Sequence, residues 1–165
     1  MKIVVMGVTA TGKTEIGKRL AYALEARFVD GDDLHPRTNV DKMARGEPLD
    51  DADRAPWLDR VGTTLAGRAG PIVVACSALK RAYRDRIRRH AGGTVLFVHL
   101  TGPKDVIAER MRTRKGHFMP LSLLDSQIAT LELPGPEEIV IEGDITLAPA
   151  ALTGRLLDGL RAYDV

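Results

Sequence analysis

Short apolar runs alternate with stretches of helical periodicity along most of the chain. The runs predicted as strands are Lys2–Met6, Arg27–Asp30, Pro71–Cys76, Thr94–Leu100 and Glu138–Ile141. Strands that alternate with helices form βα units, and such units assemble around a parallel sheet. The pattern therefore predicts an α/β fold with a parallel sheet built from these runs.

The segments between the runs place apolar residues on one face of a helix. Ile16, Leu20 and Leu24 follow the first run at intervals of four residues, which gives a single apolar stripe. Proline at position 103 suits the first turn of a helix. Helices are predicted to begin at Lys13 and Pro103 and to cover about Arg54–Arg68, Leu79–His90 and Pro149–Ala162.

Two stretches, Gly31–Asp53 and Arg112–Pro136, interrupt this alternation. Both are polar and are punctuated by glycine and proline, and long irregular insertions in compact domains are usually functional. We expect one domain over residues 1–165, with a substrate-binding insertion at about residues 31–60 and a closing lid at about residues 112–136.

Composition restricts the class of protein. The 165 residues have a formal net charge of +2, which is too small to indicate a nucleic-acid or membrane partner. The longest apolar runs fall well short of the roughly 20 residues of a membrane span. Cys76 has no second cysteine to pair with, and the first residues form a strand instead of a removable signal. These features favour a cytoplasmic protein.

The strongest motif lies between the first predicted strand and the first predicted helix. Its sequence GVTATGKT fits the phosphate-binding pattern G-x-x-x-x-G-K-S/T in the required strand–loop–helix context. Glycines let the backbone N–H groups approach phosphate, the lysine neutralises the β- and γ-phosphates, and the final hydroxyl binds Mg²⁺. The predicted ATP-binding residues are Gly7, Val8, Thr9, Ala10, Thr11, Gly12, Lys13 and Thr14.

Acidic residues indicate which kind of phosphate-loop protein this is. The third predicted strand ends without a carboxylate, no Asn-Lys-x-Asp motif is present, and a GTPase is therefore a poor fit. Carboxylates follow the second strand instead, in the sequence Asp30-Gly31-Asp32-Asp33. In a small-molecule kinase, Asp30 would hold Mg²⁺ through water and Asp32 would accept a hydrogen bond, and potentially the proton, from the attacking hydroxyl. A solvated turn is the alternative.

Basic residues supply candidates for transition-state charge. Arg110 and Arg114 are four residues apart and project toward the predicted lid, where a cation can stabilise the transferring phosphoryl group. A solvated basic helix end explains the same spacing equally well.

The helix after the third strand is strongly basic. A nucleic-acid surface is disfavoured because the net charge is small and no aromatic cluster accompanies the run. Lys80 and Arg84 share a face at its start and could meet an anionic acceptor, whereas Arg88 and Arg89 are predicted to be solvated. His35 and His117 lie in the two insertions and are substrate-contact candidates. Trp57 and His99 are predicted to be structural.

With both insertions in view, the chain resembles the thermoresistant type of gluconokinase over essentially its full length. The segments that carry the resemblance, besides the phosphate loop, are DGDDLHP (30–36), GEPLDDADRAPWL (46–58), CSALKRAYRDRIR (76–88), RKGHFMP (114–120) and LLDSQIATLE (123–132). The resemblance implies a P-loop nucleoside-kinase-like three-layer sandwich with a five-stranded parallel sheet and a helical lid. It also implies ATP and Mg²⁺ as cofactors, phosphorylation of D-gluconate on its 6-hydroxyl, and frequently a homodimer.

The residues suit such a substrate. Gluconate is a polyol with a carboxylate, so Arg54 or Arg84 could supply a cationic fork, while Asp32, His35 and His117 could pair with hydroxyls. A kinase of another small hydroxylated acid such as shikimate, a nucleotide kinase, or a nucleotide-binding regulator without an acceptor remain alternatives.

One departure from the family concerns the phosphate loop. Ala10 stands where the family usually has glycine, and we expect ordinary backbone angles there and at most an altered nucleotide affinity.

Overall fold

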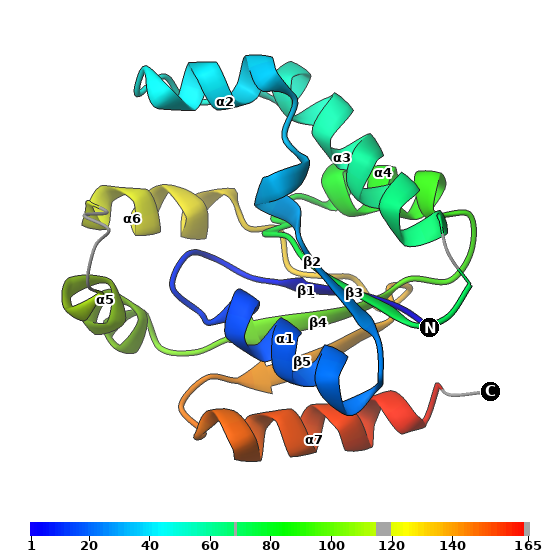
Figure 1. The fold of residues 1–165 in the computed structure, drawn as a ribbon. Helices are drawn as coiled ribbons and strands as arrows, with labels where there is room; N and C mark the ends of the chain where they lie inside the picture. Colours follow the sequence, from blue (N-terminus) through cyan, green and yellow to red (C-terminus); the bar gives the residue numbers. More distant parts are fainter. Residues whose placement is uncertain (68, 115–119, 164–165) are drawn as a thin grey trace.

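The computed structural model describes residues 1–67, 69–114 and 120–163 of the chain. The elements in order are β1 (Lys2–Met6), α1 (Lys13–Ala23), β2 (Arg27–Asp30), the 3₁₀ turn η1 (Gly31–Leu34), α2 (Arg37–Ala44), α3 (Asp51–Ala66), β3 (Ile72–Ala75), α4 (Arg81–Ala91), β4 (Leu96–Thr101), α5 (Lys104–Thr113), α6 (Leu121–Thr130), β5 (Val140–Asp144) and α7 (Pro149–Arg161). Figure 1 shows their arrangement.

The described strands form one five-stranded parallel sheet in the order β2-β3-β1-β4-β5. The central strand β1 pairs with two neighbours, so Ile3 lies opposite both Val73 and Leu96. All strands are parallel, and their carboxyl ends therefore meet at one edge. This confirms the predicted sheet, although β5 begins at Val140 and not at Glu138.

Alternate residues of β1 face the two sides of the sheet. Ile3 and Val5 belong to a core that includes apolar residues of α1, α5, α6 and α7, whereas Val4 and Met6 pack with those of α3 and α4. In Figure 1, α7 accordingly lies below the sheet and α1 in front of its strands, whereas α3 and α4 lie above it. The predicted three-layer α/β sandwich is confirmed.

The two stretches expected to be irregular contain helices. α2 was missed because most of its residues are polar and its apolar Val40 and Met43 are exposed, so it shows no buried stripe. α3 begins at Asp51, before the predicted start at Arg54, because Asp50 and Asp53 form a reciprocal capping box. In the second stretch, α6 packs on the core through Leu124, which is 1% exposed.

None of the helices in the described part of the chain combines the length and the apolar character that a bilayer-crossing segment needs.

Candidate active site

The phosphate loop connects β1 to α1 at the carboxyl edge of the sheet. Gly7 has a φ of 147°, and a Cβ there would lie 2.7 Å from the carbonyl oxygen of Leu100. Gly12 precedes α1 with a φ of 90°, in the region that favours glycine. Both glycines of the motif are therefore required by backbone geometry, and the loop leads directly into the positive end of the α1 dipole.

Ala10 adopts a left-handed conformation within this loop. Its φ is 61°, so the expectation of ordinary backbone angles is wrong. Such a conformation costs an L-residue roughly 1–2 kcal/mol, and alanine, which has only a Cβ, keeps the steric conflict small. Inside the loop, the hydroxyl of Thr11 donates a hydrogen bond to the carbonyl of Val8 at 2.8 Å.

Lys13 folds back over the loop. Its ammonium group donates a hydrogen bond to the carbonyl oxygen of Val8 at 2.9 Å. Burial lowers the pKa of Lys13 from 10.5 to about 8, and the negative charge of Asp32 opposes that shift. The ammonium group is therefore held over the loop in an environment that disfavours its positive charge. A bound phosphate group would stabilise that charge.

This lowered pKa predicts proton uptake on nucleotide binding. A bound polyphosphate favours the charged ammonium, so above about pH 8 nucleotide binding must add a proton to Lys13, whereas below about pH 7 the proton is already present. We expect the affinity for MgADP to fall by up to about tenfold per pH unit above pH 8. Calorimetry in buffers of different ionisation enthalpy measures the uptake directly.

Lys13→Arg is the matched control, because a guanidinium stays charged over this range. Uptake in the wild-type protein that persists unchanged in Lys13→Arg would mean that another group takes up the proton.

Thr14 and Asp30 lie together beside the loop. The Thr14 hydroxyl is 3.5 Å from one carboxylate oxygen of Asp30, and the other oxygen accepts the backbone N–H of Asp32 at 3.0 Å. Mg²⁺ is typically held by one or two protein oxygens together with waters and substrate phosphates, and this pair fits that requirement. The described part of the chain contains no cluster of three or more metal-ligating side chains.

Asp32 and His35 follow β2, Asp32 within η1 and His35 directly after it. Partial loss of hydration raises the pKa of Asp32, and the neighbouring Asp30 raises it further. Burial lowers the pKa of His35, which favours a neutral ring that can both donate and accept hydrogen bonds. Trp57 stacks on His35 with ring centroids 4.2 Å apart, and its Nε1–H donates to the Gly31 carbonyl at 2.7 Å.

Trp57 is thus buried as predicted. It also supports a candidate substrate residue, which its helical spacing alone did not reveal.

An open cleft of about 890 Å³ joins part of the predicted site, but His35, Arg54 and Lys80 do not line it. The phosphate loop and Lys13 form one wall, and Asp32, Arg110 and Arg114 line the same space. Arg110 donates a hydrogen bond to the Ile145 carbonyl at 2.5 Å, and Arg114 directly follows the last residue of α5. His117, the other candidate in this stretch, lies outside the described residues.

Arg54 and Lys80 meet at the start of α3 and α4. Both approach the carboxylate of Asp51, Lys80 at 3.2 Å and Arg54 at 4.0 Å. Both also lie over the ring of Tyr83, at 5.9 Å for Arg54 and 5.5 Å for Lys80. The Tyr83 hydroxyl donates a hydrogen bond to Asp51. Sequence reasoning missed Asp51 and Tyr83, because nothing in their spacing links two helices.

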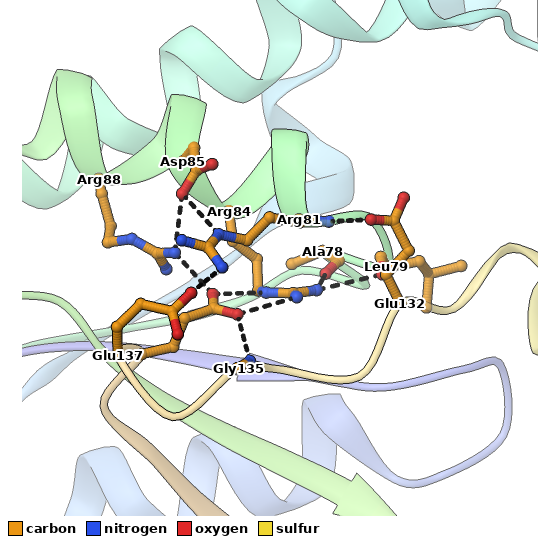
Figure 2. A network of polar contacts seen from close by, with 10 residues as sticks. Ala78, Leu79, Arg81, Arg84, Asp85, Arg88, Glu132, Gly135 and Glu137 are labelled. Atoms are coloured by element: carbon orange, nitrogen blue, oxygen red, sulfur yellow. Dashed lines mark hydrogen bonds and ion pairs between the residues drawn. The ribbon is translucent and has the colours of Figure 1, made fainter.

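Arg84 does not reach the cleft. Its side chain is 0% exposed and donates two hydrogen bonds to the Glu138 carboxylate, at 2.8 and 3.1 Å. It also donates to the carbonyls of Ala78 and Leu79 (Figure 2). The predicted substrate contact is therefore wrong for Arg84, because this face of α4 packs against the segment that leads from α6 to β5.

Arg88 belongs to the same network and is not simply solvated as predicted. It donates to Glu138 at 2.6 Å and to Asp85 at 2.9 Å (Figure 2). Burial alone would raise the pKa of Glu138, but hydrogen bonds from Arg84, Arg88 and the Gly135 N–H lower it to about 2. The signal that could have identified this pairing is the acidic Glu137-Glu138 before β5, opposite a basic helix.

Comparison with known proteins gives one family match and several close relatives. A sequence-family model described as an AAA domain matches residues 3–134. A gluconokinase from Gluconobacter oxydans (strain 621H) is 45% identical, and the alignment covers 98% of this chain and 92% of that protein. The thermoresistant gluconokinase of Escherichia coli (strain K12) is 44% identical over 82% of this chain and 78% of that protein.

A solved structure agrees with these sequence relatives. The crystal structure of a gluconokinase from Sinorhizobium meliloti 1021 superposes on this chain with a TM-score of 0.89 at 48% sequence identity. The superposition covers 98% of this chain and 92% of that one.

Proposed function

The chain belongs to the gluconokinase family, and from this premise we propose that it transfers the terminal phosphoryl group of ATP to the 6-hydroxyl of D-gluconate. The products are 6-phospho-D-gluconate and ADP. The observation that carries the proposal is the shared cleft in which Lys13, Asp32, Arg110 and Arg114 face the phosphate loop. This arrangement supports roles for Lys13 in binding phosphate, for Asp32 in binding the acceptor hydroxyl, and for the two arginines in neutralising charge.

The nucleotide half of the site is residues 7–14. Their backbone N–H groups and the Lys13 ammonium would hold the phosphates of ATP. Thr14 would bind Mg²⁺ directly and Asp30 through water, consistent with their 3.5 Å separation. When bound, Mg²⁺ neutralises charge on the phosphate oxygens.

Asp32 is assigned to the acceptor hydroxyl. The bond from the acceptor oxygen to the γ-phosphorus forms as the bond from that phosphorus to the β–γ bridging oxygen breaks. Asp32 orients the hydroxyl and can receive its proton, which its raised pKa favours. Arg110 and Arg114 stabilise the charge on the transferring group, and closure of residues 112–136 over the cleft would exclude water.

Arg54 and Lys80 are assigned to the gluconate carboxylate. They lie side by side at the starts of α3 and α4, and both pair with the Asp51 carboxylate. They replace Arg84 in this role, since Arg84 is fully occupied in the buried network. His35 and His117 are assigned to hydroxyl groups, His35 because its stacked neutral ring can donate or accept.

ADP release with MgATP tests the activity. The assay compares no acceptor with D-gluconate, shikimate and a nucleoside monophosphate. Among these acceptors, we expect only gluconate to give a strong rate. A site built to pair with the hydroxyl groups of one substrate rejects acceptors that lack hydroxyl groups in those positions. A preference for shikimate or the nucleotide would reassign the substrate. ADP release that no acceptor changes would support a nucleotide-binding regulator. The gluconokinase relatives favour gluconate over these alternatives.

Assembly and location complete the proposal. We assign a homodimer in the cytoplasm, the dimer by resemblance to the family and the location by the absence of a second cysteine to pair with Cys76. Light scattering coupled to gel filtration measures the oligomeric state.

A further inference from the structure

A side chain from α6 reaches the phosphate loop. The Oε1 atom of Gln127 accepts the backbone N–H of Thr9 at 2.6 Å, and this contact joins residues 118 positions apart in the sequence. Because Gln127 belongs to the stretch expected to form the lid, the contact links that part of the chain directly to the nucleotide site.

The contact falls next to the strained residue of the loop. Thr9 immediately precedes Ala10, whose φ of 61° is disfavoured for any residue with a Cβ. The N–H of Thr9 belongs to the peptide bond between Val8 and Thr9, so the contact restricts the peptide just before the one that leads into Ala10. Within the loop, Thr11 and Lys13 donate hydrogen bonds to the Val8 carbonyl and so fix the backbone at Val8. Gln127 therefore adds restraint at the point where the left-handed turn begins.

α6 is itself held firmly enough to present this amide. Leu124, one helical turn before Gln127, is 1% exposed and packs in the core that includes Val8 of the loop. Past the end of α6, the backbone N–H of Glu132 donates to the Leu79 carbonyl at 2.9 Å. On its outer side, Asp125 pairs with Lys104 of α5 at 2.5 Å. In this conformation, contacts on both sides of the amide hold α6 beside the loop.

We propose that Gln127 is a positioning residue that holds the phosphate loop in its nucleotide-binding shape and offsets the strain of Ala10. The inference rests on the proposed function only in taking residues 7–14 as the nucleotide site. It predicts that the contribution of the Gln127 contact to MgADP affinity depends on which residue occupies position 10. Glycine adopts positive φ without penalty, so a loop that carries Ala10→Gly needs the restraint less.

A double-mutant cycle between positions 127 and 10 tests this dependence. Gln127→Met keeps the length of the side chain and removes the acceptor. Calorimetry measures the dissociation constant of MgADP for the wild-type protein, for Gln127→Met, for Ala10→Gly and for the double variant. We expect Gln127→Met to weaken MgADP binding about tenfold in the wild-type loop and less than about threefold in the Ala10→Gly loop. Ser126→Ala, on the exposed neighbour in α6, is the matched control and should not change binding.

The outcomes separate a positioning role from a structural one. An equal loss in both backgrounds, or no loss in the wild-type loop, overturns the proposal. Gln127→Ala serves in the same cycle if Gln127→Met does not fold. Because MgADP binding needs no acceptor, failure of gluconate turnover would remove the proposed function and leave this inference intact. If the substitutions at positions 127 and 10 do not couple, this inference fails and the proposed function is unaffected.

Discussion

Replacing Asp32 with asparagine is expected to lower kcat by about 10²–10⁴-fold, while the affinity for MgATP stays close to that of the wild-type protein. The amide keeps the size and a hydrogen-bond acceptor but cannot receive the proton of the acceptor hydroxyl. Asp32 lies in the same cleft as Lys13, and reduced hydration and the nearby Asp30 raise its pKa, as suits a group that takes a proton. Steady-state kinetics with varied gluconate, together with MgATP calorimetry, measures both quantities.

Asp33→Asn is the matched control for this prediction. Asp33 is the neighbouring carboxylate in η1 and is exposed like Asp32, but it does not line the cleft with Lys13 and Asp32. We expect near wild-type turnover from it. If Asp32→Asn instead weakened MgATP binding and left kcat unchanged, Asp32 would belong to the metal shell and the acceptor role would pass to another residue.

Replacing Lys13 with alanine is expected to lower kcat/KM for ATP by about 10²–10³-fold without loss of the fold. The ammonium is the cation held directly over the loop, and it stabilises negative charge on the transferring phosphoryl group. Stability should change little, because burial already disfavours the charged form of Lys13 and lowers its pKa to about 8. We expect Tm to shift by less than about 4 °C, which corresponds to roughly 1 kcal/mol for a domain of this size.

Arg19→Met provides the comparison for the loss of one positive charge. Arg19 lies on the same helix, is exposed and does not line the cleft, although its partner Glu15 does. It should retain turnover and Tm. Wild-type turnover in a folded Lys13→Ala protein would contradict the proposed nucleotide site. A large fall in Tm would show that Lys13 supports the loop as well as the phosphate.

Patterns that are local in the chain were sufficient to predict the fold and the loop that we propose as the nucleotide site. β1 and the loop after it were predicted because an apolar run, two glycines and a Lys-Thr pair occur together within Lys2–Thr14. The order of β2 and the acids that follow it likewise placed Asp30 and Asp32 at the carboxyl edge of the sheet. Parallel strands bring such residues together whatever the intervening sequence, so the cleft that joins Lys13 to Asp32 follows from topology.

Contacts between residues that are distant in the chain leave no comparable pattern in the sequence. Arg84 had the spacing of a surface cation, and only the packing of α4 against the segment before β5 paired it with Glu138, 54 residues away. Ala10 was expected to adopt ordinary angles, but its φ in the folded loop is positive. The sequence by itself thus determined the sheet, the phosphate loop and the acidic turn, because each depends on neighbouring residues. The tertiary structure alone decided which cations face the cleft and which are buried, because that depends on how helices pack.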